Sequence, residues 1–356
     1  MKFIFFSKTM YDEIPRIRHQ LAYLLMKFDH QVIFFQKPAF PSVFNNKLIN
    51  KKIGNDIEIR QTKQLIHHQL RVFDWIIALN SKYESNQIFK SLENIKNNDV
   101  IVNFNYDYFF LRRLFPHNKI ITIINDDFIA QAKFFNGKHV ERSLGLTIKN
   151  SDVNLTVSYP LFNQIKNLGG KVNLFLPWTE SYYIKPNFEK RSKSILIWAS
   201  INSVIDFDLI YFLSNSLKDF NFYLIGPLDN TIENTVIRLC ENKNIHYHNP
   251  VNLEDLLNIS NFFMGLMPYK TNVKSTEAVT IANKTFRLMS LGMPLVVHGM
   301  PNFFEHPAIL KSKTYDEVIS NIQYCFENFE NLQDDICKLI SENTDEVRYN
   351  QFINYI

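Results

Sequence analysis

Short runs in which almost every residue is apolar recur along this chain, and stretches with apolar residues at helical spacing separate them. The first run covers residues 2–6, a helical pattern follows over residues 14–27, and a second run covers residues 31–35. Runs that are apolar at every position are typical of strands buried on both faces, as in a parallel sheet covered by helices. A strand–helix–strand unit of this kind joins parallel strands through a right-handed crossover. The sequence therefore predicts an α/β fold.

The apolar runs form two consecutive series with a polar stretch between them. The first series continues with runs at 75–79, 100–104, 120–124, 153–157 and 171–176. The second series has runs at 194–198, 221–225, 245–247, 262–267 and 295–297, with helical patterns at 208–217, 233–242, 315–329 and 334–342. We therefore expect two doubly wound, Rossmann-like domains that face each other across a cleft. In such sheets, ligands bind beyond the carboxyl ends of the strands.

The length of 356 residues suits two domains of ordinary size. We expect the first domain at residues 1–177, a linker at 178–193 and the second domain at 194–342. The C-terminal segment, 343–356, is expected to pack back on the first domain.

The composition excludes several classes of protein. The chain has only nine glycines and contains neither G-x-G-x-x-G nor G-x-x-x-x-G-K-[ST], which argues against a Rossmann dehydrogenase and a P-loop NTPase. Its three cysteines (Cys240, Cys325, Cys337) are too widely spaced for a disulfide framework or a zinc site, which fits the cytoplasm. The net charge of +4 is too small to indicate nucleic-acid binding. Residues 1–6 are apolar only over the length of a strand, so we expect them to form neither a signal peptide nor a membrane anchor.

The segment 282–297 carries the strongest indication of a ligand. A helical pattern starts at Asn283, Lys284 and Thr285, stops at Gly292, and is followed by an apolar run at 295–297. A helix N-terminus offers unpaired N–H groups and a partial positive charge to a phosphate, and a lysine adds a full charge. The segment therefore predicts a diphosphate site. The alternative is a solvated lysine at the start of a helix.

Two aspartates, Asp126 and Asp127, directly follow the run at 120–124. A carboxylate at this end of a parallel strand is placed to take a proton from an acceptor hydroxyl. The alternative is that an aspartate caps the helix N-terminus that follows. The sequence does not choose between the two residues.

Further candidates follow other strands. Asp12, Arg18 and His19 come after the first run and are candidates for the acceptor site, with His19 as a base or Arg18 as an anion ligand; exposed charges at a helix start are the alternative. Gly226, at the end of a strand, is expected to allow close backbone approach. Candidates for the donor pocket are Trp198, Ser200, Asn202, Gly226, Tyr269, Lys270, Thr276 and Glu277, although 268–281 also fits a mobile surface loop.

Asp206 and Asp208 resemble a metal-binding pair, but helix capping explains them better, so we expect no metal.

A basic stretch lies at residues 45–71. It contains Lys47, Lys51, Lys52, Arg60, Lys63 and Arg71 among apolar residues. Such a stretch is suited to peripheral contact with an anionic membrane that carries a lipid-linked acceptor. Solvated helix faces are the alternative.

Five segments in this order resemble the GT-B glycosyltransferases, and more narrowly the bacterial surface-polysaccharide branch with teichuronic-acid and xanthan-type glucuronosyltransferases. They are R-I-R-H-Q-L-A-Y-L-L-M-K-F-D-H-Q-V-I-F-F (16–35), I-I-N-D-D-F (123–128) with Glu141 and N-S-D-V-N-L-T-V-S (150–158), F-Y-L-I-G-P (222–227), 244–269 and 282–297. The resemblance implies that the first domain binds a glycan or lipid-linked acceptor. It implies that the second binds a nucleotide-diphosphate sugar, with a UDP-sugar favoured. We expect a cytoplasmic enzyme, and the basic stretch at 45–71 suits a position at the inner face of the cell membrane.

The chain departs from this family's pattern at Arg287. Many relatives carry a glutamate there that accepts hydrogen bonds from the donor ribose, whereas arginine has donors only. Glu277 is the candidate to replace it, and Arg287 suits a phosphate or a sugar carboxylate. This departure favours inversion with Asp126 or Asp127 as base. The alternatives are a non-catalytic GT-B subunit that binds a partner or glycan, and a sugar-nucleotide epimerase or hydrolase of the same fold.

Overall fold

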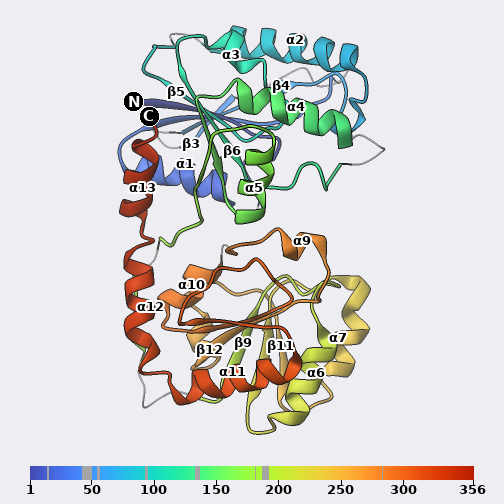
Figure 1. Cartoon of the computed structure of the whole chain (residues 1–356), viewed down its shortest axis with the longest axis vertical. Helices are drawn as coiled ribbons and strands as arrows, with labels where there is room; N and C mark the ends of the chain where they lie inside the picture. Colours follow the sequence, from blue (N-terminus) through green and yellow to red (C-terminus); the bar gives the residue numbers. More distant parts are fainter. Residues whose placement is uncertain are drawn as a thin grey trace. The chain divides into compact units, whose positions relative to one another are not determined.

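A computed structural model of the chain describes residues 1–13, 16–41, 50–53, 57–92, 95–132, 137–180, 182–186, 192–282 and 284–356. The chain divides into two compact units (Figure 1). Unit 1 comprises Met1–Leu176 and Tyr349–Ile356, and unit 2 comprises Pro177–Arg348. Each unit has its own sheet.

The sheet of unit 1 has eight strands in the order β3-β4-β2-β1-β5-β6-β7-β8. The strands are β1 (Lys2–Phe6), β2 (Gln31–Ala39), β3 (Asn50–Ile53), β4 (Ile57–Lys63), β5 (Val100–Asn103), β6 (Lys119–Ile124), β7 (Val153–Thr156) and β8 (Val172–Leu174). Neighbouring strands are parallel, except that β3 is antiparallel to β4. The helices are α1 (Ile17–Lys27), η1 (His68–Leu70), α2 (Asp74–Ser91), α3 (Leu111–Leu114), α4 (Gly137–Lys149) and α5 (Tyr159–Asn167).

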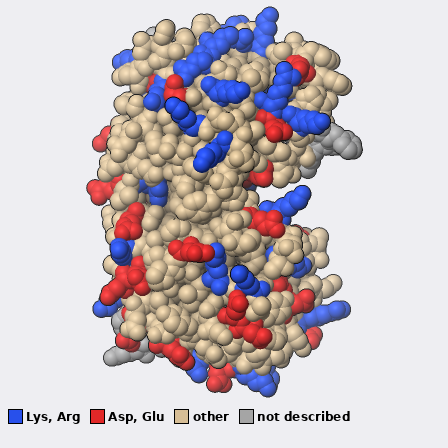
Figure 2. Space-filling view, in the orientation of Figure 1, with Lys and Arg blue, Asp and Glu red and all other residues tan. Residues whose placement is uncertain are grey.

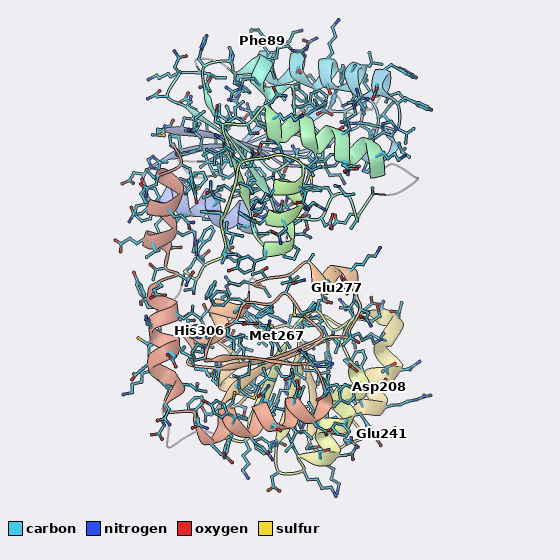
Figure 3. The ribbon with its side chains drawn as sticks, in the orientation of Figure 1. Phe89, Asp208, Glu241, Met267, Glu277 and His306 are labelled. Carbon is cyan, nitrogen blue, oxygen red and sulfur yellow. The ribbon has the colours of Figure 1, made fainter. Side chains whose placement is uncertain are left out.

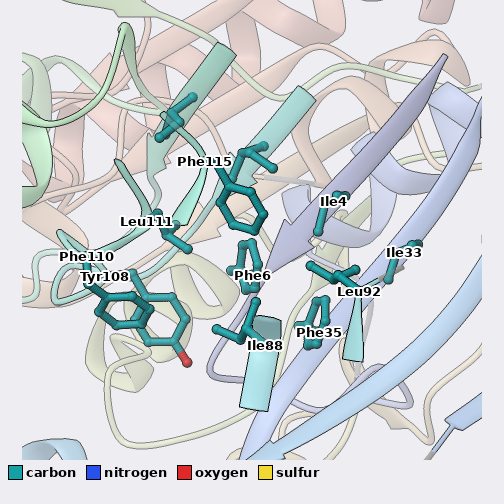
Figure 4. Close-up of a cluster of buried hydrophobic side chains, with 12 residues drawn as sticks. Ile4, Phe6, Ile33, Phe35, Ile88, Leu92, Tyr108, Phe110, Leu111 and Phe115 are labelled. Carbon is teal, nitrogen blue, oxygen red and sulfur yellow. The ribbon is translucent and has the colours of Figure 1, made fainter. Parts of the chain in front are cut away.

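The central strands β1, β5 and β6 of this sheet are buried on both faces, which is why they are apolar at most positions. On one face, Phe6 stacks on Phe35 at a centroid distance of 4.9 Å in a cluster that includes Ile88 of α2 (Figure 4). On the other face, Phe3 contacts Phe352 at 6.1 Å. Phe352 belongs to α13 (Asp345–Ile353), so the C-terminal end of the chain contributes to the core of unit 1.

The sheet of unit 2 has six parallel strands in the order β11-β10-β9-β12-β13-β14. They are β9 (Ser194–Trp198), β10 (Asn221–Ile225), β11 (Ile245–His248), β12 (Met264–Pro268), β13 (Leu295–His298) and β14 (Ile309–Ser312). The helices are α6 (Phe207–Ser216), η3 (Asn230–Ile232), α7 (Glu233–Leu239), α8 (Leu256–Ile259), α9 (Lys274–Glu277), α10 (Lys284–Ser290), α11 (Tyr315–Glu327) and α12 (Leu332–Ser341). The stretch after Pro177 packs within this unit, because Trp178 is fully buried and its Nε1 donates to Asp345 at 2.8 Å.

Two sequence expectations about these elements are wrong. Residues 75–79 belong to helix α2, although their apolar run was expected to form a strand. The described part of 45–71 contains the antiparallel pair β3 and β4, so solvated helix faces do not account for it. In β4, Ile57 and Ile59 are buried while Glu58 and Arg60 are half-buried, which is the alternation of a strand. The sequence also gave no indication of β14, because half of its I-L-K-S sequence is polar.

Among the described residues, no helix combines the length and the apolar character that are needed to cross a bilayer.

Candidate functional site

The two aspartates after β6 have different environments. The Asp127 Oδ1 accepts hydrogen bonds from the backbone N–H of Ala130 at 2.9 Å and from Nε2 of Gln164 at 3.1 Å. Asp127 therefore stabilises the turn after β6 and ties it to α5; residues 128–131 form a turn and not the helix that the capping alternative expected. Asp126 accepts from Nδ2 of Asn125 at 2.7 Å, and burial raises its pKa while the positive charge of Arg18 opposes that shift. Of the pair, Asp126 is the better candidate for a proton acceptor.

Arg18 is a buried cation with donors to spare. Its side chain lies in the first turn of α1 and is 4% exposed, and Nε and Nη2 find no hydrogen-bond partner among the described residues. Burial lowers its pKa to about 10, while the charge of Asp126 acts in the opposite direction. Because buried guanidinium donors are normally satisfied, this side chain suits an oxygen-rich ligand beside Asp126.

The structure does not favour His19 as a base. The backbone N–H of Arg16 donates to its Nδ1 at 3.1 Å, so the neutral ring carries its proton on Nε2, which lies 3.4 Å from the carbonyl oxygen of Met10. The side chain is 1% exposed, and burial followed by the charge of Arg18 lowers its pKa. His19 therefore fixes the loop between β1 and α1. Asp12 lies exposed on the same loop.

A buried network of charges that the sequence analysis did not find lies at the same edge of the sheet. Asp107, beyond β5, accepts from Nζ of Lys8 and from Nη1 of Arg71 at 2.9 Å. Arg71 also pairs with Glu84 of α2 at 2.8 Å. Lys8 and Asp107 closely follow the ends of buried strands, which is the one signal in the sequence that would have drawn attention to them. The network ties the loops after β1 and β5 to α2.

In unit 2, Lys284 lies at the carboxyl edge of the sheet. Its Nζ donates to the carbonyl oxygen of Trp198, at the end of β9, at 2.6 Å, and to the hydroxyl of Tyr269, just beyond β12, at 3.2 Å. Within the described part of the chain, Lys284 forms no ion pair with a carboxylate. A cation held by neutral oxygens at this edge of a parallel sheet remains available to an anion. The sequence prediction for Asn283 falls outside the described residues.

Two glycines shape this edge. Gly226, after β10, has a φ of +150°, and a Cβ there would lie 1.8 Å from the carbonyl oxygen of Ala199. Gly299, after β13, has a φ of +74°, and a Cβ there would lie 1.9 Å from the carbonyl oxygen of Tyr269. The close backbone approach predicted at Gly226 is therefore present, and the same constraint at Gly299 was missed.

Several other predicted donor contacts are less accessible than expected. Thr285 is fully buried, so its hydroxyl is not presented to a ligand. Thr276 is also buried, and its hydroxyl donates to the carbonyl oxygens of Val273 at 2.9 Å and Gly299 at 3.1 Å, so its proton holds the loop. The segment 274–277 forms helix α9, which ends at the half-buried Glu277 (Figure 3).

The remaining donor candidates keep some exposure. Lys270 and Ser200 are exposed, and Trp198, Asn202, Tyr269 and Arg287 are half-buried. The Asn202 side chain accepts from the backbone N–H of Val204 at 3.1 Å, which fixes the loop after β9. Arg287 forms no ion pair within the described part of the chain, so its guanidinium adds to the positive charge of α10.

The Asp206 carboxylate caps α6, as the capping interpretation predicted, by accepting from the backbone N–H of Leu209 at 3.0 Å. It also accepts from the hydroxyl of Tyr315 at 3.1 Å and lies 4.0 Å from Nε2 of His298. Asp208 is exposed on α6 (Figure 3). In the part of the chain that the structure describes, no three His, Cys, Asp or Glu side chains come together to hold a metal ion.

No family model matches this chain, and no curated protein matches it significantly. Solved structures do match over the whole chain. HepE of Anabaena in complex with UDP is 10% identical and covers 99% of both chains with a TM-score of 0.71. An α,α-trehalose-phosphate synthase (UDP-forming) from Burkholderia xenovorans, in complex with glucose-6-phosphate, is 11% identical over 99% of both chains with a TM-score of 0.66. A trehalose-6-phosphate synthase studied for glycosyl transfer with retention is 10% identical over 99% of this chain and 98% of its own, with a TM-score of 0.64.

These neighbours have the GT-B fold, and their likeness extends over both units of this chain. The chain therefore has the GT-B fold with two Rossmann-like domains, which confirms the fold class that the sequence predicted. At about one residue in ten identical, the likeness establishes the fold and leaves the reaction to be argued from the residues.

Proposed function

We propose that this protein is a glycosyltransferase that moves a sugar from a nucleotide-diphosphate donor, with a UDP-sugar favoured, to a hydroxyl of a glycan or lipid-linked acceptor. The observation that carries the proposal is Lys284, a cation without a carboxylate partner among the described residues, at the carboxyl edge of the unit 2 sheet. The neighbours HepE, bound to UDP or UDP-glucose, and trehalose-phosphate synthase support a UDP-sugar as the donor.

In this proposal, unit 2 holds the donor and unit 1 holds the acceptor. Asp126 accepts the proton of the acceptor hydroxyl. The oxygen of that hydroxyl bonds to the anomeric carbon, and the bond from this carbon to the diphosphate breaks. Lys284, with Arg287 on the same helix, offsets the negative charge that develops on the departing diphosphate. Arg18 holds oxygen atoms of the acceptor beside Asp126.

A single displacement assisted by Asp126 inverts the anomeric centre. One neighbour of the same fold is described as transferring with retention, so the stereochemistry of this chain is a direct test of the Asp126 assignment. We expect the product to have the opposite anomeric configuration from the donor when its coupling constants are read by NMR. Retention would exclude Asp126 as the base of a single displacement.

The biological setting is part of the proposal. The resemblance to surface-polysaccharide enzymes favours a role in cell-surface polysaccharide or glycoconjugate synthesis, in the cytoplasm at the inner face of the cell membrane. We expect transfer to need no obligatory cofactor or metal, so activity should persist in the presence of a chelator. Loss of activity with EDTA and its return with a divalent cation would contradict this.

The donor site is tested by replacing Lys284. Removing one charge-assisted contact is expected to weaken binding of UDP by roughly 10- to 150-fold, the equivalent of about 1.5–3 kcal/mol. Titration calorimetry with Lys284→Ala and Lys284→Gln measures this, and the glutamine keeps a donor for the Trp198 carbonyl. Lys218→Ala, at an exposed lysine of the same unit, is the matched control. Unchanged UDP affinity in both Lys284 variants, with intact melting temperatures, would refute the donor site.

The same assay separates the alternative functions. A non-catalytic subunit shows no donor turnover with any acceptor, whereas an epimerase or hydrolase converts the donor when no acceptor is present. A transferase consumes the donor in proportion to the acceptor that it modifies.

A further inference from the structure

Helix α2 in unit 1 has an inverted distribution of polar and apolar side chains. Its buried residues are mostly polar and comprise Asn80, Ser81, Glu84, Ser85 and Ile88. Its exposed side chains include Trp75 (66%), Leu79 (50%) and Phe89 (73%). A surface helix normally turns its apolar face to the core, so packing within unit 1 does not account for these three residues.

Specific polar contacts fix this orientation. The Glu84 carboxylate pairs with Arg71 at 2.8 Å, and Oδ1 of Asn80 accepts from the backbone N–H of Leu65 at 2.8 Å. Oε1 of Gln87 accepts from the backbone N–H of Lys63 at 2.8 Å. Rotating the helix to bury Leu79 would break these contacts, and the charges that they neutralise would gain no new partner. The apolar face is therefore held outward.

The outward residues form a stripe along the helix. Trp75, Leu79, Lys82, Asn86 and Phe89 are exposed and follow one another at steps of four and three residues, which places them on one side. The rise of about 1.5 Å per residue makes the stripe roughly 21 Å long between its terminal aromatic residues. Phe73, the residue just before the helix, is also exposed (57%). Single exposed apolar side chains are ordinary, but a row of them is typical of an interaction surface.

The charge on this face is positive. Lys82 and Lys90 are exposed, whereas both acidic residues of the helix are paired, Asp74 with Arg142 at 2.5 Å and Glu84 with Arg71. Figure 2 shows Lys and Arg side chains predominating over the end of unit 1 where α2 lies, and Phe89 projects outward at that end in Figure 3. A surface that combines an apolar stripe with lysines is complementary to the headgroups and acyl chains of anionic lipids.

We propose that the exposed face of α2 binds the surface of an anionic bilayer, with the helix lying in the plane of the interface. Trp75, Leu79 and Phe89 enter the boundary between headgroups and acyl chains, and the lysines reach the phosphates along their apolar stems. A second copy of this chain fits the face less well. A symmetric pair would bring the unpaired lysines of the two faces together, where like charges repel.

This surface belongs to the unit that we assign to the acceptor. Binding to a membrane would bring the enzyme to a lipid-linked acceptor, and this consequence rests on the proposed function. The binding of vesicles itself does not depend on that function. The surface also differs from the basic stretch at 45–71 that the sequence suggested for membrane contact. Of that stretch, Arg60 pairs with Glu58 at 2.9 Å and Arg71 is buried, so both of these charges are already neutralised.

The test uses the full chain with vesicles of phosphatidylcholine alone and of phosphatidylcholine mixed with phosphatidylglycerol. We expect the protein to sediment with the mixed vesicles and its tryptophan emission to shift to shorter wavelength. Trp75 is the tryptophan that can report this, because Trp178 is fully buried and Trp198 is half-buried in unit 2. The variant Leu79→Glu/Phe89→Glu should lose at least tenfold in vesicle affinity. Lys82→Gln should lose about fivefold on mixed vesicles only, in line with one charge at the surface.

Ile237→Glu is the matched control, because Ile237 is 58% exposed on α7 in unit 2. It should bind vesicles like the wild type. Wild-type protein that stays in the supernatant with mixed vesicles would overturn the proposal, as would an α2 variant that binds unchanged. A dimer in sedimentation velocity that Leu79→Glu/Phe89→Glu dissociates, without vesicle binding, would assign the face to a second copy instead. The melting-temperature rise with UDP should persist in the α2 variants, so a failure here is distinguishable from a failure of the donor site.

Discussion

The buried network of Lys8, Arg71, Glu84 and Asp107 makes Asp107→Asn the most informative stability variant. All four side chains lie inside unit 1, and the two cations balance the two carboxylates. Asparagine keeps the shape of Asp107 but leaves two buried cations beside one carboxylate. Because an unbalanced buried charge cannot be solvated, unit 1 should lose stability out of proportion to the small chemical change.

The size of the effect follows from the geometry. At the 2.9 Å that separates Arg71 Nη1 from Asp107 Oδ2, two unit charges attract by about 6 kcal/mol at an effective dielectric constant of 20. Removing the carboxylate also removes the cost of burying it, so the net loss should be roughly 3–5 kcal/mol. For a unit of this size, that corresponds to a melting temperature lower by about 6–20 °C.

Differential scanning calorimetry at neutral pH measures this loss, with Asp219→Asn as the control. Asp219 makes the same kind of ion pair with Lys193 at 3.6 Å, but it is 83% exposed, so its replacement should cost less than about 1 kcal/mol. An Asp107 variant that melts no lower than the Asp219 variant would refute the reasoning.

The pH dependence of this difference has a definite sign. Burial raises the pKa of Asp107, but the charges of Lys8 and Arg71 outweigh that effect and hold it below its usual value. A carboxylate whose pKa is lowered by folding stabilises the protein above its unfolded pKa and loses that contribution as the pH falls through the folded value. The gap between wild type and Asp107→Asn should therefore stay open near neutrality and narrow only in acid below about pH 4.

Three further predictions concern the candidate site. Asp126→Asn should lower kcat by roughly 10²- to 10⁴-fold in a coupled UDP-release assay, with UDP affinity unchanged, and a loss below tenfold would remove Asp126 from the chemistry. Arg18→Met removes the charge that opposes the raised pKa of Asp126, so that pKa should rise further and the acidic limb of kcat against pH should move to higher pH; an unmoved limb would contradict this. Gly226→Ala should destabilise unit 2 by at least about 1–3 kcal/mol, because a Cβ meets the Ala199 carbonyl at 1.8 Å, and an unchanged calorimetric melt would disprove the constraint.

The sheets were predictable from the sequence because both of their faces are buried. A parallel strand covered on both sides is apolar throughout, and β1, β9 and β10 have the bounds that this pattern predicted. The same rule failed at residues 75–79. In that run Trp75 and Leu79 face outward from a helix whose polar side is held by Arg71 and Leu65. Contacts with residues outside the helix leave no mark on its own pattern.

The candidate site was predictable in position and less so in detail. The rule that ligands lie beyond the carboxyl ends of strands led to Asp126 and Asp127, and the start of a helix led to Lys284. The structure places the two aspartates just after β6 and the Nζ of Lys284 beside the end of β9. The difference between the two aspartates depends on Gln164, which lies far along the chain and donates to Asp127. The full burial of Thr285 likewise depends on tertiary packing. No local pattern could have separated these residues into ligand contacts and structural supports.

The two sheet edges differ in charge in the way that the proposed glycosyl transfer requires. The departing diphosphate gains negative charge, and the edge of unit 2 offers Lys284 and Arg287 without carboxylate partners among the described residues. The attacking hydroxyl must lose a proton, and the edge of unit 1 offers Asp126, a carboxylate whose pKa burial raises. A raised pKa makes a carboxylate a stronger base, and the nearby charge of Arg18 limits that rise. Asp126 and Arg18 therefore act as a pair in the proposed transfer, because the charge of each shifts the pKa of the other.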